Sequence, residues 1–491
     1  MTTTRPLLTR TRLLLAVLPL CLTACQSLAP HYQRPAAPVA AVYPDGPVNE
    51  AAHQVANEAP SPPLPWRDYF TDPPLQALIT QALENSRDLR TAALRVQEAQ
   101  ALYGIGHADL FPTIGAQAGL DRSRTPADLN LTRRPLVGSA YQAGLGLSSW
   151  EIDLWGRLRS LDDAALESAR ASQATRSAVA LSLMAQVADA WLELAELDER
   201  LEIANQTIAS RQESFRIFSR RVEVGATSRL NLTQIETLLT QAQALGAQLQ
   251  QQRAQRLNAL TLLVGSPVVL PVGQARAGLD AVFAPLQPGL PALLLTRRPD
   301  VAAAEHRLMA ANANIGAARA AFFPSISLTG NVGTASAELS GLFRDGSHAW
   351  TFSPSITLPI FTAGRLRNNL ALSEVRRDLA VAAYEKTVQT AFREVADALA
   401  ARQWLTQQLE IAQSAVRVQR ERARLSALRY DNGAAPFLDV LDAQRDLLNA
   451  QQQLVQIRRA LLSSSVALYA ALGGEGVAAV PSPPSPSRSG S

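Results

Sequence analysis

Cysteine is almost absent from this sequence, which limits what can hold the fold together. Only Cys21 and Cys25 occur in 491 residues, and both lie near the amino terminus. A mature chain that loses Cys21 with a leader keeps one cysteine and can form no internal disulfide. The five histidines have neither ligand spacing nor cysteine neighbours, so we predict no metal site.

Signatures of catalysis and of nucleic-acid binding are also missing. No GxSxG or Walker-type loop occurs, and Gly104-Ile105-Gly106 lacks the third glycine of a dinucleotide fingerprint. Lys386 is the only lysine, and the many arginines are interleaved with Asp and Glu instead of forming a block. Interleaved charge does not favour a nucleic-acid partner. We therefore predict that the protein is not an enzyme and that it needs no cofactor.

Glycine and proline are missing from two long segments, 157–224 and 365–432. At 1.5 Å per residue, a helix of either length would reach roughly 100 Å. Charged side chains throughout both segments exclude burial in lipid, while apolar residues recur at helical spacing. These segments are predicted to be long helices that pack side by side.

The chain is built twice. The segments Arg221–Gln243 and Arg429–Gln451 share one pattern, 208 positions apart, and each contains one turn glycine, Gly225 or Gly433. Nearly the same register extends upstream, which indicates a tandem duplication. Glycine suits the two turns because it accepts a positive φ at a helix end.

Each repeat is predicted to contain one β-hairpin with strands of about ten residues. Apolar residues alternate with Ser and Thr across 325–332 and 350–360, and more weakly across 114–120 and 141–147. The apolar phase changes near Trp150, which predicts a bulge. Such strands suit an outer-membrane barrel. Considered alone, they equally suit the edge of a sandwich packed on helices.

Four strands are too few to close a barrel, and open strand edges cannot face lipid. If the strands enter a membrane, several copies must share one barrel, with eight strands from a dimer or twelve from a trimer. Twelve strands leave room for a channel, whereas eight are filled by side chains. The long helices begin where the hairpins end, so a helical tube would continue the barrel.

The amino terminus reads as a secretion signal followed by a lipid-attachment site. Arginines precede a short apolar core, Leu13–Leu22, which is too short to span a bilayer. Leu22-Thr23-Ala24-Cys25 resembles the bacterial lipobox, in which the cysteine is acylated; an ordinary cleavage site is the alternative. Gln26 in place of Asp indicates the outer membrane for lipoproteins of this kind. Two or more acyl chains on Cys25 would give stable anchoring.

The motifs together resemble the TolC-type outer-membrane efflux proteins, and the lipidated OprM-like branch in particular. The resemblance covers nearly the whole chain after the signal. It is carried by Trp66-Arg67-Asp68-Tyr69-Phe70, Arg297-Arg298-Pro299-Asp300, Ile315 to Ser325, Leu358-Pro359-Ile360-Phe361 and Leu438 to Arg445.

The resemblance implies a mostly helical fold with a small membrane β part, in a homotrimer with a twelve-stranded barrel and a periplasmic helical barrel. It implies an outer-membrane exit duct for drugs and other small toxic compounds. A periplasmic adaptor and an inner-membrane transporter, expected to be proton-driven, would be its partners. A duct for type I protein secretion and a structural periplasmic coiled-coil lipoprotein are the alternatives.

A candidate gate lies after the second tip glycine. Asp439 and Asp442 share one face of the returning helix, where the helix dipole alone would stabilise them. In a trimer they would form a ring of six carboxylates, and such rings favour cations. The resemblance implies that Leu438 forms the constriction. It also implies that Tyr430 helps to lock the tip, where Arg445 is placed to pair with Asp442; the family's acidic and basic lock partners are replaced by Asn231 and Ala435.

These expectations divide the chain into consecutive segments. They are a signal peptide (1–24), a lipidated Pro-rich strap (25–72), repeat 1 (73–265, with hairpin 111–155 and helices 157–222 and 228–264), a connector (266–287), repeat 2 (288–473, with hairpin 323–362 and helices 365–430 and 436–472) and a disordered tail (474–491).

Overall fold

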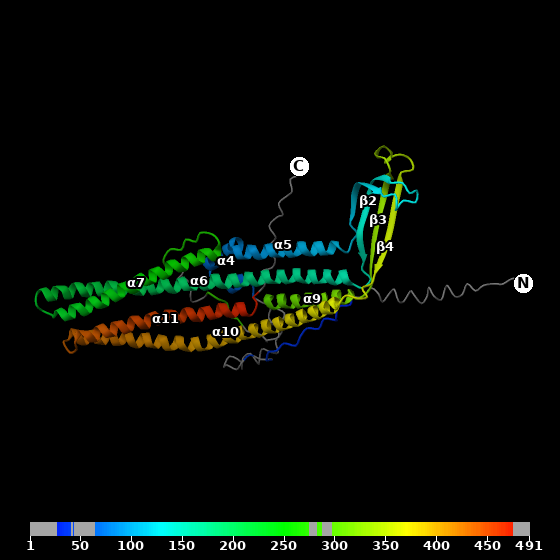
Figure 1. Cartoon of the computed structure of the whole chain (residues 1–491). Helices are drawn as coiled ribbons and strands as arrows, with labels where there is room; N and C mark the ends of the chain where they lie inside the picture. Colours follow the sequence, from blue (N-terminus) through cyan, green and yellow to red (C-terminus); the bar gives the residue numbers. More distant parts are fainter. Residues whose placement is uncertain (1–26, 41–42, 44–63, 274–281, 287–296, 475–491) are drawn as a thin grey trace. The chain divides into compact units, whose positions relative to one another are not determined.

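A computed structural model describes residues 27–40, 43, 64–273, 282–286 and 297–474. The leader, Cys25, most of the strap, part of the connector and nearly all of the tail lie outside these residues. The described chain is mostly helical, with one four-stranded sheet (Figure 1). The predicted combination of long helices with a small β part is confirmed.

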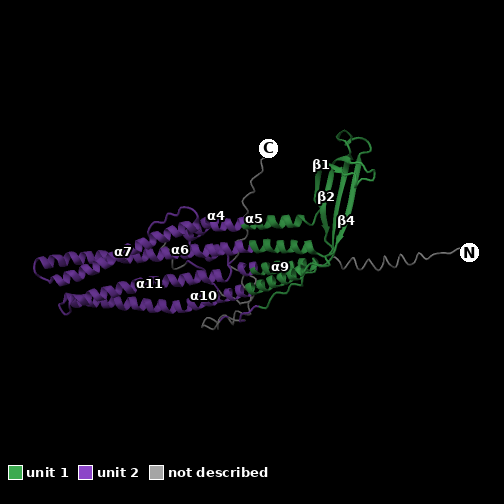
Figure 2. Cartoon of the chain, in the orientation of Figure 1, with its two compact units in different colours: residues 1–36, 95–172, 304–384 green, residues 37–94, 173–303, 385–491 purple. Residues whose placement is uncertain are grey.

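The chain forms two compact units that cut across the repeats (Figure 2). Unit 1 comprises residues 1–36, 95–172 and 304–384, and unit 2 comprises residues 37–94, 173–303 and 385–491. Each unit therefore takes matching pieces from both repeats, and neither repeat is a compact unit by itself.

The sheet of unit 1 consists of β1 (Ile114–Thr125), β2 (Leu136–Ile152), β3 (Ser325–Ser336) and β4 (His348–Thr357). All neighbours are antiparallel, in the order β1-β2-β3-β4, so both hairpins share one sheet. The 3-10 turn Leu339–Gly341 lies between β3 and β4.

The strand pattern predicted from the alternation agrees with the register in detail. Ile114 faces Leu147 and Leu120 faces Tyr141, so the apolar residues of the first hairpin oppose each other. The predicted bulge is confirmed, because the β2–β3 register shifts between Leu147 and Trp150. Two details were wrong. The strands of the first hairpin extend beyond the predicted segments 114–120 and 141–147, and β4 ends at Thr357, before the end of the predicted segment 350–360.

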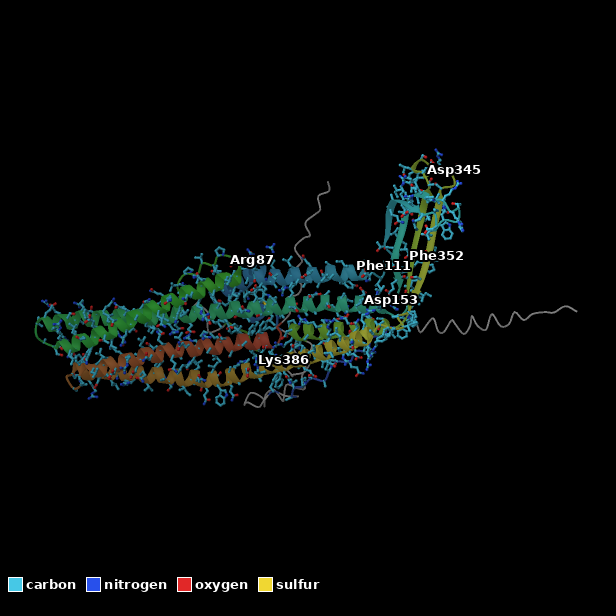
Figure 3. The ribbon with its side chains drawn as sticks, in the orientation of Figure 1. Arg87, Phe111, Asp153, Asp345, Phe352 and Lys386 are labelled. Carbon is cyan, nitrogen blue, oxygen red and sulfur yellow. The ribbon has the colours of Figure 1, made fainter. Side chains whose placement is uncertain are left out.

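Large apolar side chains stand exposed on the sheet. Trp350, Phe352 and Ile356 of β4 are 68%, 63% and 71% exposed, and Figure 3 shows Phe352 projecting from the strand. Within the sheet, Gly144 and Gly333 are paired directly. A Cβ atom on either one would collide with the backbone of the other strand, so this close approach requires glycine on both.

Short helices precede the hairpins. They are α3 (Trp66–Tyr69), α4 (Pro73–Asn85), α5 (Arg87–Ala108) and α9 (Pro299–Ala320). Asp72 caps α4, accepting a hydrogen bond from the Leu75 backbone at 3.3 Å, and a proline follows the cap.

The long helices α6 (Arg157–Glu223) and α10 (Arg365–Asp431) have 67 residues each. Their return helices are α7 (Arg229–Val264) and α11 (Phe437–Ala471). The core of unit 2 forms around α6, where Trp191 is 1% exposed, and Tyr69 stacks on Tyr469 with ring centres 4.3 Å apart. One segment of α6 is long and apolar enough for a membrane span, but 61% of it is buried inside the chain, as in the core helix of a soluble protein.

The described start of the strap is tied to α9 in unit 1. Arg34 makes a two-pronged ion pair with Glu305, at 2.7 and 2.8 Å, and the Tyr32 hydroxyl donates to the same carboxylate at 3.0 Å. The Asn312 amide donates to the Pro30 carbonyl at 2.8 Å. Because Glu305 is only 6% exposed, these bonds satisfy a buried charge.

Candidate functional site

Both long helices end in unit 2, each in a turn of the same type. Gly225 has φ +69°, and its N–H donates to the Val222 carbonyl at 3.0 Å. The next N–H, of Ala226, donates to the Arg221 carbonyl at 2.7 Å. This is the Schellman pattern, and Gly433 repeats it in the second copy. A Cβ at either glycine would meet nothing within 4 Å, so the positive φ alone explains the residue.

Three aromatic side chains, which we call the tip cluster, join these two helix ends. Phe218 of α6 lies 4.3 Å from Phe437 of α11 between ring centres, and Tyr430 of α10 lies 4.8 Å from Phe437. Arg221 donates to the Tyr430 hydroxyl at 3.0 Å, and its guanidinium lies 5.2 Å from the centre of the Phe218 ring. Phe218 is 4% exposed, so the cluster is packed within a single chain.

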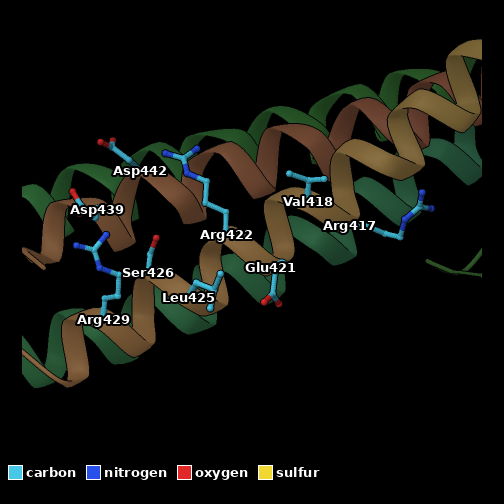
Figure 4. A pocket seen from close by; sticks show the side chains of 9 residues that line it. All are labelled: Arg417, Val418, Glu421, Arg422, Leu425, Ser426, Arg429, Asp439 and Asp442. Atoms are coloured by element: carbon cyan, nitrogen blue, oxygen red, sulfur yellow. The ribbon is translucent and has the colours of Figure 1, made fainter. Parts of the chain in front are cut away.

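The predicted acidic pair lies at the start of α11. The helix begins at Phe437, one residue later than predicted, and Pro436 is its N-cap; the Asp439 N–H donates to the Pro436 carbonyl at 3.2 Å. Asp439 and Asp442 line a groove of about 760 Å³ whose other wall, on α10, carries arginines including Arg422 and Arg429 (Figure 4). The α11 side of the groove is therefore acidic, while its α10 side carries three arginines and the carboxylate of Glu421.

Arg445 divides its charge between two carboxylates. It lies 3.1 Å from Asp442, as predicted, and 3.2 Å from Asp446. Asp446 is also paired with Arg422 of α10 at 2.6 Å. The hydrogen bond from Arg422 is the main reason why the pKa of the Asp446 carboxyl lies below its usual value. Arg422 and Asp446 therefore form an ion pair between α10 and α11 at neutral pH.

The remaining predicted gate residues lie at the same end of the helices. Leu438 is 46% exposed in the single chain. Such exposure is required of a side chain that forms a constriction together with its counterparts in other copies. Asn231 hydrogen-bonds within its own turn, to Thr227 at 3.0 Å and to Ser228 at 3.2 Å, and not to Tyr430. Gating by these residues stays a prediction.

The sequence analysis missed Arg221, Phe218, Phe437 and Asp446. Aromatic residues make up only 5% of the chain, so two phenylalanines close to the tip glycines were an available signal. No pattern in the sequence indicated that Arg221 contacts Tyr430, which lies 209 positions later. Among the described residues, no group of three His, Cys, Asp or Glu could hold a metal ion.

Comparison with known proteins identifies the family to which this architecture belongs. The sequence profile of the outer membrane efflux proteins matches residues 78–266 and again 290–474, one match for each repeat. The chain belongs to the outer membrane efflux protein family. The resemblance drawn from the sequence motifs is confirmed.

Similar proteins come from Pseudomonas. The chain is 45% identical over 470 residues to the toluene efflux pump outer membrane protein TtgF of Pseudomonas putida, covering 95% of this chain and 97% of TtgF. It is 43% identical over 456 residues to the outer membrane protein OprJ of Pseudomonas aeruginosa, covering 93% and 94%.

Solved structures of similar proteins agree with the fold. The open-state MtrE outer membrane channel of Neisseria gonorrhoeae is 39% identical, with a TM-score of 0.81 over 92% of this chain and 98% of MtrE. A membrane protein from Pseudomonas aeruginosa is 41% identical, with a TM-score of 0.83 over 91% and 98%. The protein is therefore an outer-membrane channel of an efflux system, and its function is transport, not catalysis. It works together with other pump components.

Proposed function

We propose that three copies of the chain assemble into one exit duct. The observation that supports this is the sheet of unit 1. Among the described residues, no strand pairs with the outer edge of β1 or of β4, and the apolar side chains of β4 are exposed. Open edges cannot face lipid, so neighbouring copies must supply the missing strands. Three sheets give twelve strands, which leave a central passage.

The assembly and the pore can be tested on the purified protein. Light scattering in detergent is expected to give the mass of a trimer. Planar bilayers should show steady ion-conducting pores that detergent alone does not produce. A solitary subunit that forms no pores would overturn the proposal.

We further propose that the helical tip is the gate. In a trimer, Asp439, Asp442 and Leu438 would form rings around the axis, and carboxylate rings attract cations. The tip cluster would hold the two helix ends of each copy together in the resting state. A periplasmic adaptor would open the tip, and an inner-membrane transporter, proton-driven, would supply the cargo and the energy.

Drugs and organic solvents are the proposed cargo, because similar proteins are named for toluene and antibiotic efflux. The test is genetic. The gene should restore solvent and drug tolerance to a strain that lacks its own duct but keeps the cognate pump and adaptor. Unchanged sensitivity, with the protein present in the outer membrane, would contradict this proposal.

Acylation of Cys25 is a separate proposal, because this residue lies outside the described part of the chain. Cys25→Ser should abolish incorporation of radioactive palmitate. The matched control is Cys21→Ser, inside the leader, which should keep the label. Persistent label in Cys25→Ser would refute the lipobox.

A further inference from the structure

The first hairpin projects beyond the rest of the sheet. β2 pairs with β3 only from Tyr141 onward, whereas it pairs with β1 from Leu136 onward. Residues 121–125 of β1 and 136–140 of β2 therefore form a two-stranded end, which we call the hairpin extension. It lies at the end of the strands furthest from α5 and α6, the helices on either side of the hairpin in the chain.

Below the extension, one face of the sheet carries the large apolar side chains. Side chains alternate along a strand, and residues directly opposite each other share a face. The face with Ile114 and Leu120 of β1 also carries Leu147 of β2. Pairing through β3 continues this face to Trp350 and Phe352 of β4. In the proposed duct, this face lies against lipid.

On the extension, the same face becomes basic. Arg122 and Arg124 follow Leu120 at intervals of two residues, so they lie on the lipid-facing side, about 7 Å apart along the strand. Ser139 and Val137 lie opposite them on β2. Both arginines are exposed, and neither side chain forms an ion pair or a hydrogen bond with any other described residue.

The excess of positive charge is confined to the first hairpin. Segment 121–135 contains four arginines and two aspartates, whereas segment 336–348 of the second hairpin contains one arginine, two acidic residues and a histidine. Asp121 lies on the opposite face of β1 from Arg122, and Asp128 lies in the turn beyond the strands. Neither aspartate therefore offsets the arginines on the lipid-facing side.

The pairing of the strands places the extension at the level of the lipid headgroups. Within the described chain, no strand pairs with residues 136–140 of β2 on the side of β3. Unpaired backbone N–H and C=O groups cannot face hydrocarbon, so the extension must lie beyond it. Leu120, 54% exposed, and Tyr141 opposite it form the last level below the extension. Tyrosine suits this boundary because its ring is apolar and its hydroxyl is polar.

We propose that Arg122 and Arg124 bind the phosphate groups of lipopolysaccharide, the phosphorylated glycolipid of the outer leaflet. A guanidinium group donates two parallel hydrogen bonds to one phosphate, and its charge is complementary to that of the ligand. The acyl chains of the same glycolipid lie against Leu120 and the ring of Tyr141. This inference rests on the proposed duct, whose helical tip faces the periplasm, and adds to it the lipid that surrounds the outer rim.

Two double variants of the full-length protein in detergent test the binding. Arg122→Gln/Arg124→Gln removes the two ligands. Arg365→Gln/Arg367→Gln is the matched control, because it removes the same charge from two exposed arginines at the start of α10. Purified lipopolysaccharide is added, and native mass spectrometry measures the bound glycolipid. The first variant should bind at least about tenfold more weakly than the unaltered protein, and the control within about twofold of it.

Two further lipids distinguish the glycolipid from other anions. Dephosphorylated lipopolysaccharide should bind weakly, and equally to the unaltered protein and both variants. If phosphatidylglycerol binds as tightly as lipopolysaccharide and is lost in the same variant, the surface is a general anion site and the assignment to lipopolysaccharide is overturned. Equal binding of lipopolysaccharide by all three proteins would overturn it as well.

Light scattering on the same samples separates this inference from the proposed assembly. A solitary subunit would overturn the duct and this inference with it. Trimers of Arg122→Gln/Arg124→Gln that bind lipopolysaccharide with unchanged affinity would overturn this inference alone.

A measurement on the unaltered protein removes the dependence on variants. Phenylglyoxal should modify Arg122 and Arg124 several-fold more slowly in vesicles of lipopolysaccharide than in vesicles of phosphatidylglycerol. Arg420 of α10, which is exposed in unit 2, should react equally in both. Equal rates at Arg122 and Arg124 would overturn the proposal.

Discussion

The two repeats share their backbone turns and differ in the side chains around them. Gly225 and Gly433 have the same φ and the same pair of hydrogen bonds. The long helices, in contrast, have different surroundings: Glu196 of α6 is 8% exposed, and its counterpart Trp404 of α10 is 56% exposed. This difference shows that the two copies kept the same backbone path after the duplication, while their side-chain contacts diverged. Exchanging residues between equivalent positions tests this comparison directly.

The largest effect is expected just before α9, where Arg298 contacts α9, α10 and the end of α11. In repeat 2, Arg298 pairs with Asp300 at 2.7 Å and with Glu394 at 2.7 Å, and donates to the Ala471 carbonyl at 3.0 Å. Arg298→Ala should lower the unfolding free energy by about 2–3 kcal/mol, because a 7% exposed guanidinium is replaced by a gap among its partners. Thermal unfolding in detergent measures the loss.

The control for Arg298 is its counterpart in repeat 1, Ser86, which is also buried. Ser86→Ala should shift the melting temperature far less, since no ion pair is broken. Equal shifts would mean that Arg298 contributes only by packing.

A smaller effect of opposite sign is expected at Asp189. Burial raises the pKa of this carboxyl, and its Oδ1 has no hydrogen-bond partner within the described chain. Because the pKa is raised in the folded protein, the ionised carboxylate lowers stability above that pKa. The penalty disappears as the pH falls to 3.8, the usual pKa of an aspartate carboxyl. Asp189→Asn should therefore stabilise the protein by about 1 kcal/mol at pH 8, with the gain shrinking on acidification.

The counterpart of Asp189 is Asp397, which is exposed in the single chain and lies 3.8 Å from Arg393. Asp397→Asn should leave the melting temperature at pH 8 nearly unchanged. A comparable gain there would show that general charge reduction, and not burial, explains the effect at Asp189.

The tip cluster offers a third comparison, measured as channel opening. Arg221→Gln should weaken the bond to the Tyr430 hydroxyl, worth about 1 kcal/mol, and raise the open probability in planar bilayers. The counterpart Arg429 contacts only the Ala434 carbonyl, at 3.3 Å, among the hydrogen bonds of the described tip. Arg429→Gln should change opening less. The reverse order would show that the bond from Arg221 to Tyr430 does not help to keep the tip closed.

The smallest effect is expected for ion selectivity. Asp439 and Asp442 correspond to Asn231 and Gln234 in repeat 1. Asp439→Asn with Asp442→Gln should lower the cation-to-anion permeability ratio roughly twofold at low salt, because each copy loses two carboxylates near the axis. Reversal potentials measure the ratio. An unchanged value would assign the two residues to helix stabilisation alone.

Much of the fold followed from the sequence because its signals are local or periodic. The absence of glycine and proline over 157–224 predicted α6 to within a residue of its observed end, and the phase change at Trp150 predicted the bulge.

The tip was predicted less completely because its contacts join distant positions. Asp442 and Arg445 are three residues apart on one helix, so their pairing could be read from spacing. Arg221 and Tyr430 meet only when two long helices end at the same level. Asn231 matched a family position, but its amide hydrogen-bonds locally to Thr227. The two compact units could not be predicted either, because they divide both long helices in mid-course.

The strap has a consequence for the order in which the protein can mature. Tyr32 and Arg34 are among the first described residues, yet they share a carboxylate at Glu305, 271 positions after Arg34. The amino-terminal segment therefore cannot form these bonds until more than half of the polypeptide has been synthesised and exported. Closing so long a loop is entropically costly, so the amino-terminal segment should be among the last parts to dock, after the helices that receive it have formed.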